Sequence, residues 1–279
     1  MSIEKGYEDF LQSFFVRETV EAGQLMSVRG WAERNAGNIS RIIPYGEAEK
    51  YFDLNNPKKY FDLDLNIREL SGKIFLIKAT GKFFRKLHEN PASGLGAVRI
   101  AKDGKRLELL WGFEGDNSPT SEMRMHFLGH IERLKADPDH KVIMHTHATN
   151  TIVMSTMGEL DEKGFISALW RMHSECLVIF PDGVGLLPWM VPGTQDISTA
   201  TAEKFKDYRL IIWPLHGIIA AGNSMDEAMG LIETVEKTAE IYVKSMGLSK
   251  SPRVVTDKQL LEIAEHFKVT PREGILEES

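Results

Sequence analysis

The sequence is short of cysteine, with Cys176 alone among 279 residues. One cysteine cannot form an intrachain disulfide, so a disulfide-stabilised fold is excluded and a reducing compartment is indicated. A secretory signal pattern is missing as well, because the opening residues MSIEKGYEDFLQ carry acidic groups and no apolar core. We therefore expect a cytoplasmic protein.

Long hydrophobic runs and an excess of positive charge are also absent. The longest nearly apolar stretch, from Leu210 to Gly222, is interrupted by Pro214 and His216, and a membrane-spanning helix needs about 20 apolar residues. The formal net charge is −6, which disfavours nucleic-acid binding through net positive charge. We expect neither a membrane nor a nucleic acid as partner. The GxGxxG and GxxxxGK[ST] phosphate-binding motifs do not occur.

What is present is the composition of an ordinary globular protein, with 42% hydrophobic and 27% charged residues. No repeat, low-complexity segment or Gly/Ser-rich linker divides the chain, so we expect one domain over residues 1–279. Hairpin signals alternate with helical patterns along the sequence. This mixture predicts an α/β fold, a single-domain sandwich in which a mostly antiparallel central sheet is flanked by helices, rather than a doubly wound parallel sheet.

Hydrophobic periodicity and turn residues locate the expected elements. Helices are predicted over residues 10–32, 82–88, 119–136, 150–157, 162–173, 196–206 and 225–246. Strands are predicted over residues 39–43, 73–79, 96–100, 106–111, 142–147, 175–180, 186–189 and 209–220. Residues 44–57 are predicted to be a loop or a short insertion.

Two histidines stand two residues apart on one of these strands. Side chains alternate along a strand, so His145 and His147 are expected to point the same way and to be able to share a metal ion. His216, beside Gly217, is expected to add a third nitrogen from a neighbouring strand. Three neutral imidazoles leave an open position on a divalent ion, as in catalytic zinc sites. The alternative is that the HxH pair holds no metal and that His216 is a buried core residue.

A second cluster lies on the helix predicted to start at Ser118-Pro119. Glu122, His126 and His130 are spaced to share one face, and a packing role is the favoured interpretation for both histidines. Glu122 is expected in the first turn, where free N–H groups and the partial positive charge attract an anion such as phosphate. The hydroxyls of Thr120 and Ser121 would add to such a site.

Several segments together resemble a known family, the zinc-dependent class II sugar-phosphate aldolases. The resemblance extends from about residue 28 to residue 270, and the longer blocks around the motifs favour the branch that acts on rhamnulose 1-phosphate. The segments that carry it are Asn35-Ala-Gly-Asn-Ile-Ser40, Thr80-Gly81-Lys82, Thr120-Ser121-Glu122, His145-Thr-His147 and His216-Gly217.

The resemblance implies a site and a reaction. It implies one Zn²⁺ per subunit, retro-aldol cleavage of a sugar phosphate, and a homotetramer with the site near a subunit interface. Glu122 resembles the catalytic carboxylate, and Glu175 resembles an acidic residue contributed by a neighbouring subunit. The residues that resemble zinc ligands are His145, His147 and His216, and those that resemble the phosphate and dihydroxyacetone contacts are Asn35, Gly37, Asn38, Thr80, Gly81 and Ser121.

One position departs from the family pattern. Ala79-Thr80-Gly81 replaces the usual Gly-Ser/Thr-Gly, but Thr80 keeps the hydroxyl, so phosphate binding is expected to persist. The open alternatives are another sugar-phosphate aldolase such as one for fuculose phosphate, a ribulose-phosphate 4-epimerase, and a non-catalytic binding module like the adducin head domains. A metalloprotease is disfavoured because no HExxH is present.

Overall fold

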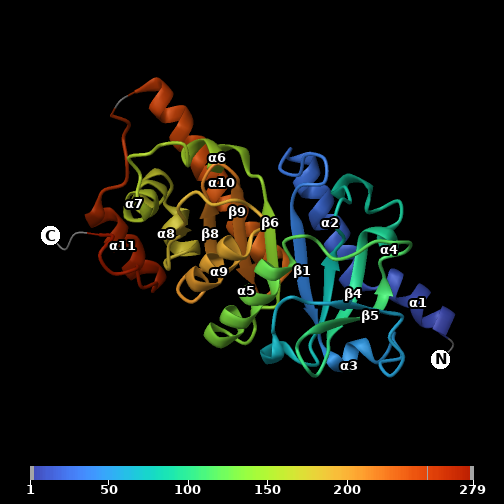
Figure 1. The fold of residues 1–279 in the computed structure, drawn as a ribbon. Helices are drawn as coiled ribbons and strands as arrows, with labels where there is room; N and C mark the ends of the chain where they lie inside the picture. The colour runs from blue at the N-terminus through green and yellow to red at the C-terminus, as the bar shows by residue number, and fades with distance from the viewer. Residues whose placement is uncertain (1–2, 250, 277–279) are drawn as a thin grey trace.

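The computed structural model describes residues 3–249 and 251–276. A nine-stranded sheet runs through the molecule in the order β2-β5-β4-β3-β1-β6-β9-β8-β7 (Figure 1). The strand pairs are antiparallel except for β7 and β8, which are parallel. Helices flank the sheet, so the predicted α/β class with a mostly antiparallel central sheet is confirmed.

The elements have the following bounds. The strands are β1 (Asn38–Ile43), β2 (Lys59–Asp62), β3 (Ile74–Lys78), β4 (Leu95–Ile100), β5 (Arg106–Gly112), β6 (Val142–Thr146), β7 (Gly185–Leu186), β8 (Leu210–Trp213) and β9 (Gly217–Gly222). The helices are α1 (Ile3–Leu11), α2 (Phe14–Val28), α3 (Tyr45–Ala48), α4 (Pro91–Gly94), α5 (Met123–Ala136), α6 (Thr149–Met154), α7 (Glu162–Met172), α8 (Glu175–Ile179), α9 (Gln195–Lys204), α10 (Met225–Leu248) and α11 (Asp257–Phe267), with the 3₁₀ turns η1 (Arg68–Leu70) and η2 (Phe84–Lys86).

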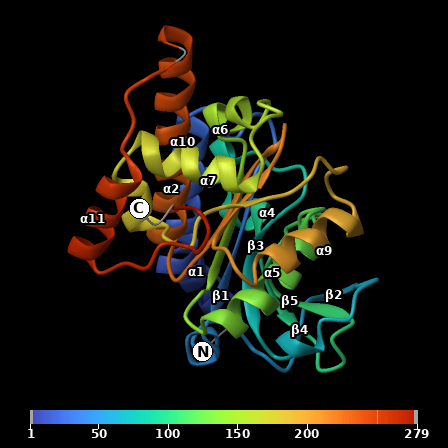
Figure 2. The same cartoon turned by 90° about the vertical axis from the view of Figure 1, so that its left-hand side faces the viewer.

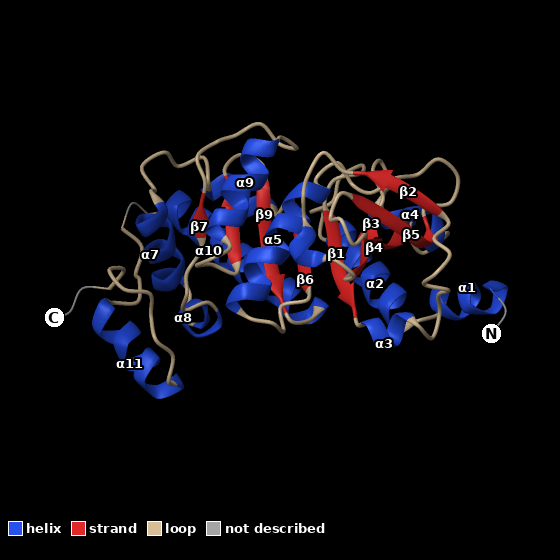
Figure 3. Ribbon diagram, turned by 60° about the horizontal axis from the view of Figure 1, so that its bottom comes forward, coloured by secondary structure: helices blue, strands red, loops and turns tan. Residues whose placement is uncertain are grey.

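Alternation along the central strands divides the core between the two faces of the sheet. On β3, Ile74 and Leu76 join the cluster that also holds residues of α2, α7, α8, α10 and α11. Phe75 and Ile77 point the other way, into a cluster with Phe127 of α5. Figure 2 shows α10 and α5 on opposite sides of the sheet, and α1 and α11 lie at opposite ends of the molecule in Figures 1 and 3. The sheet is therefore packed on both faces.

One predicted strand is wrong: residues 175–180 form helix α8 (Glu175–Ile179). The run ECLVI is short, apolar and without a clear period, and such a run fits a buried helical turn as well as a strand. Its Cys176 and Leu177 are buried. Tertiary packing decides the conformation here.

Other predicted boundaries move for local reasons. The helix expected over 10–32 breaks at Ser13, whose hydroxyl caps α2 by accepting from the Val16 N–H. The helix expected from Pro119 starts at Met123, because Pro119 pairs with Ala79 in an isolated bridge. The segment 82–88 contains only the turn η2, and the strand expected over 209–220 is a hairpin of β8 and β9.

Several short or terminal elements were not predicted: α1, β2, the short α3 within the expected loop, η1, α4 and α11. The signal for α11 was present, because Thr256 and Gln259 form a capping box at its start. No helix in residues 3–249 and 251–276 combines the length and apolarity needed to cross a bilayer.

Candidate functional site

Most of the candidate site residues from the sequence lie together where the ends of the central strands β3, β1 and β6 meet. The start of β1, the end of β3, the end of β6, the β8–β9 turn and the start of α5 meet there around a cavity of about 150 Å³. Ladder pairing explains the meeting, since Asn38 opens β1 directly opposite His145 near the end of β6. The cavity is lined by Asn35, Ala36, Gly37, Asn38, Lys78, Thr80, Gly81, Thr120, Ser121, Glu122, His145, His147 and His216.

The three histidines form a compact group. The ring centroids of His145 and His147 are 5.3 Å apart, and each lies 4.9 Å from the ring of His216. One nitrogen from each ring can be chosen so that all three lie within 4.8 Å of one another. Such a group has the size and donor type to hold a divalent metal ion.

The outer nitrogens of two rings are already engaged. His145 Nδ1 donates to the Ile218 carbonyl at 3.1 Å, and His147 Nδ1 donates to the Glu33 carboxylate at 2.7 Å. Because both acceptors can only accept, each Nδ1 carries a proton, and Nε2 is the ring nitrogen available to a metal ion. Carbonyl and carboxylate partners of this kind orient metal-binding histidines.

Burial keeps the inner face of the group neutral. His145 Nε2 is buried and has no hydrogen-bond partner within the described residues. Burial and the neighbouring His147 lower the pKa of His145 to about 3, and burial lowers the pKa of His216 as well. An uncharged ring with an unused, buried lone pair is what a metal ion requires, so these residues fit one.

His216 reaches the group from a tight turn rather than from the strand expected. Pro214 cannot donate to a ladder, and Leu215 adopts a left-handed φ of 60° with its N–H bonded to the Ser155 hydroxyl at 2.9 Å. Gly217 then lets the hairpin approach β6 closely. A Cβ there would lie 2.4 Å from the Thr146 carbonyl oxygen and 3.0 Å from Cε1 of His145.

Glu122 faces the histidines from the start of α5. It is the N-cap residue rather than a first-turn residue, and its side chain caps no backbone N–H. Its Oε2 lies 3.8 Å from His145 Nε2 and accepts a hydrogen bond from Asn38 Nδ2 at 2.5 Å. A carboxylate held beside the open side of a metal site can bind the ion or move a proton on a ligand.

A buried chain of hydrogen bonds, called the relay below, connects Glu122 to His126 and His130 on the inward face of α5. Asn38 donates to Glu122 and accepts from His126 Nε2–H. Ser40 donates to His126 Nδ1 at 2.7 Å and accepts from His130 Nε2–H at 2.9 Å. Burial lowers the pKa of His126 well below its usual value and that of His130 to about 3, so both rings are neutral. Each bond direction is thereby determined.

The remaining predicted contacts form the rim of the cavity. Asn35, Thr80, Gly81 and Ser121 are exposed. Gly37 is buried at φ 73°, and a Cβ there would lie 2.9 Å from the His145 carbonyl oxygen. Only glycine combines this left-handed backbone with so close an approach. The rim offers hydroxyls and backbone N–H groups, which suit a phosphate.

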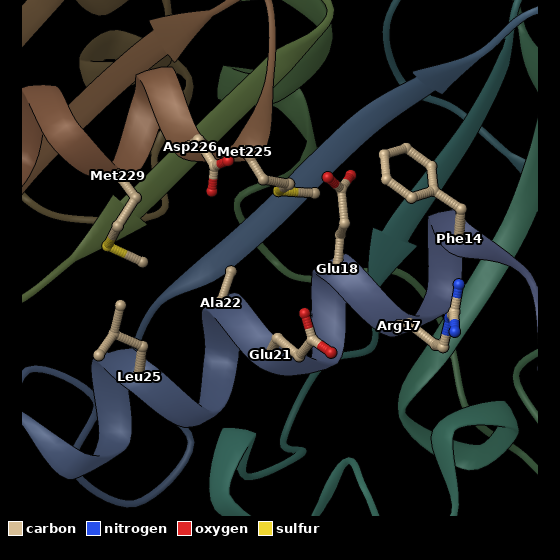
Figure 4. A pocket seen from close by; sticks show the side chains of 9 residues that line it. All are labelled: Phe14, Arg17, Glu18, Glu21, Ala22, Leu25, Met225, Asp226 and Met229. Carbon is tan, nitrogen blue, oxygen red and sulfur yellow. The ribbon is translucent and has the colours of Figure 1, made fainter.

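Glu175 is the predicted site residue that stays outside this cavity. It is exposed at the first position of α8, on another part of the chain. Its contribution to the site of a neighbouring subunit stays a prediction. A separate groove of about 450 Å³ between α2 and the start of α10 contains none of the predicted site residues (Figure 4).

Two residues of the site were missed in the sequence. Glu33 orients His147, and Lys78 places a buried ammonium in the cavity wall. Lys78 carried a signal, because a lysine at the end of the apolar strand IFLIK is out of character with its neighbours. Glu33 is an exposed acid next to Arg34 and carried none.

Comparison with known proteins places this arrangement in a family. The model for the class II aldolase and adducin N-terminal domain matches residues 17–243. The chain belongs to the class II aldolase and adducin family.

Named relatives extend the comparison over nearly the whole chain. The rhamnulose-1-phosphate aldolase of Listeria innocua is 44% identical over 269 residues, which cover 96% of this chain and 98% of that protein. The enzyme of the same name from Enterococcus faecalis is 44% identical over 268 residues, with 96% of each chain covered. The crystal structure of a sugar-phosphate aldolase from Thermotoga maritima superposes with a TM-score of 0.73 at 28% identity, covering 85% of this chain and 97% of that one.

Proposed function

We propose that this protein is a zinc-dependent aldolase that cleaves L-rhamnulose 1-phosphate to dihydroxyacetone phosphate and L-lactaldehyde in rhamnose catabolism. The observation that carries the proposal is the meeting of three clustered histidines, a carboxylate and a hydroxyl-rich rim in one cavity. The substrate is taken from the relatives named rhamnulose-1-phosphate aldolase, which match almost the full chain.

The ligands we propose are His145, His147 and His216. Zinc bound there supplies a Lewis acid that stabilises negative charge on the substrate's oxygens. The donor set favours zinc, since imidazole nitrogens are among its usual ligands and three of them leave a position open. The carbonyl and carboxylate behind His145 and His147 hold the rings in place.

Cleavage of the C3–C4 bond takes a proton from the C4 hydroxyl and leaves an electron pair on C3, which must later be protonated. We assign the proton transfer at C3 to Glu122, because its carboxylate faces the histidine group and Asn38 holds one of its oxygens in place. Glu175 of a neighbouring subunit is the proposed acid–base group at the C4 oxygen, on the resemblance alone.

The phosphate and the dihydroxyacetone portion are assigned to the rim and the adjoining wall. Thr80 and Ser121 offer hydroxyls, and the glycines offer backbone N–H groups without a side chain in the way. This explains how a chain with net charge −6 can bind an anion locally. The full set of proposed contacts is Asn35, Gly37, Asn38, Thr80, Gly81 and Ser121.

We further propose a single domain that assembles as a cytoplasmic homotetramer. The support is the family resemblance, together with one sheet that runs through the described residues. Sedimentation of the purified protein tests the assembly, and a monomer with full activity would contradict it.

A product assay separates the candidate functions. The zinc-loaded protein should release dihydroxyacetone phosphate from L-rhamnulose 1-phosphate faster than from L-fuculose 1-phosphate. Conversion of ribulose 5-phosphate to its 4-epimer without cleavage would favour the epimerase instead. No turnover of any of these, with zinc bound, would favour a binding module, although the intact triad and Glu122 argue against one.

A further inference from the structure

Lys78 is a buried cation that the proposed reaction has not yet used. It is the last residue of β3, its residue surface is only 2% exposed, and it lines the cavity beside the rim. Its backbone is held by the β3–β4 ladder, where Lys78 lies opposite Leu95, and by the loop residue Thr120, whose N–H donates to the Lys78 carbonyl at 3.0 Å. The backbone of Lys78 is therefore fixed close to the site.

The position of the ammonium group is set by two contacts. Nζ donates to the backbone carbonyl of Asn35 at 3.0 Å and lies 4.9 Å from the centroid of the Phe84 ring. Both neighbours attract a cation, the carbonyl through its dipole and the ring through its π face. Asn35 belongs to the same loop as Gly37, so the ammonium lies against the segment assigned to phosphate.

Nothing in the described part of the chain neutralises this charge at close range. Lys78 forms no ion pair within 4.0 Å among residues 3–249 and 251–276, and Glu122 acts on it only at longer range. An ammonium has three N–H donors, of which the Asn35 carbonyl accepts one. Burial lowers the pKa of Lys78 to about 8, and the negative charge of Glu122 opposes this shift without cancelling it.

We propose that the Lys78 ammonium binds the substrate's phosphate group and supplies the counter-charge that the rim lacks. The inference rests on the proposed function in so far as the ligand is a phosphate ester. An ammonium is a strong point-charge donor to phosphate oxygens. The hydroxyls and backbone N–H groups of the rim are neutral, so Lys78 would be the cation of this subsite.

The test compares a charged ligand with its uncharged analogue. Binding of dihydroxyacetone phosphate and of dihydroxyacetone is measured by calorimetry on the zinc-loaded wild type and on Lys78→Met. We expect Lys78→Met to bind dihydroxyacetone phosphate at least about tenfold more weakly, the usual effect of losing a hydrogen bond to a charged group. Binding of dihydroxyacetone should weaken far less than binding of dihydroxyacetone phosphate, since it carries no phosphate for the ammonium to contact.

The chain offers a matched control in Lys82. Its Nζ donates to the Ser93 hydroxyl at 2.9 Å, so its ammonium is directed to a neighbouring pocket. Lys82→Met should bind both ligands as the wild type does. Lys78→Gln keeps a donor without the charge and serves as a second variant if Lys78→Met does not fold, with the same loss expected for the phosphate ligand alone.

The outcomes separate this inference from the proposed function. Equal weakening of both ligands, or no weakening of either in Lys78→Met or Lys78→Gln, overturns the phosphate role while wild-type binding leaves the aldolase proposal intact. Borohydride trapping of dihydroxyacetone phosphate on Lys78 would also overturn it, because the amine would then react with the carbonyl. A zinc-loaded wild type that binds no dihydroxyacetone phosphate overturns both proposals.

Discussion

The substitution Ser40→Ala tests the buried hydrogen-bond relay behind Glu122, the carboxylate proposed to be catalytic. Ser40 is fully buried and joins two imidazoles, donating to His126 Nδ1 and accepting from His130 Nε2–H. Alanine removes both bonds and leaves two buried ring nitrogens unpartnered. The volume of one hydroxyl is too small to admit a replacing water molecule.

The expected cost follows from the number of groups left without a partner. A buried donor or acceptor that loses its partner costs about 1–3 kcal/mol, so the two nitrogens predict a loss of about 2–6 kcal/mol in the free energy of unfolding. The relay ends on Asn38, which holds Glu122. We therefore also expect a lower kcat, because His126 is no longer held from behind.

The assay is urea unfolding at pH 7.5 and fixed protein concentration, with Ser198→Ala as the control. Ser198 is also buried, but its hydroxyl donates only one bond, to the Thr194 carbonyl at 2.8 Å. Its loss should cost about 0.5–1.5 kcal/mol. The reasoning is refuted if Ser40→Ala destabilises no more than Ser198→Ala does.

Three further predictions concern the carboxylate, the rim and the buried histidines. Glu122→Gln should lower kcat by about 10²–10⁴-fold at unchanged zinc content, whereas near-normal turnover would move the proton transfer to another group. Ser121→Ala should weaken dihydroxyacetone phosphate binding about tenfold or more, and unchanged affinity would remove Ser121 from the phosphate contacts. His126 and His130 have depressed pKa values in the folded protein. Below about pH 6.5 these two side chains therefore bind protons in the unfolded chain but not in the folded chain. The free energy of unfolding should therefore fall by about 3 kcal/mol for the pair between pH 7.5 and 5.5. Imidazole NMR signals of His126 and His130 that titrate near pH 6.5 in the folded protein would contradict this.

Periodicity explains how far the fold could be predicted. The two-residue repeat of a strand placed His145 and His147 together, and the structure has them on and just after β6. The same reasoning failed at residues 175–180, where five apolar or small positions carried no period and packing selected a helix. Periodicity also failed at Pro214, because it predicts one strand over 209–220 where the structure has a hairpin turn between β8 and β9.

The candidate site was predictable where short motifs carry it and not where distant contacts do. Glu122 and His216 were chosen from their sequence neighbours. The pairing of Glu33 with His147 spans 114 positions, and that of Asn38 with Glu122 spans 84. No local pattern encodes such contacts, because they arise only once the sheet order is formed. Lys78 lies between these cases, since its place directly after the apolar run IFLI is visible in the sequence, but its burial and its contact with Asn35 are not.

Metal analysis of single-histidine variants tests the central claim most directly. Wild type, His147→Ala, His216→Ala and the control His266→Ala, an exposed residue of α11, are loaded with zinc, desalted and analysed on the same day. The account predicts about one zinc per chain in the wild type and in His266→Ala, and greatly reduced zinc in the other two variants. Full zinc in both His147→Ala and His216→Ala would contradict it.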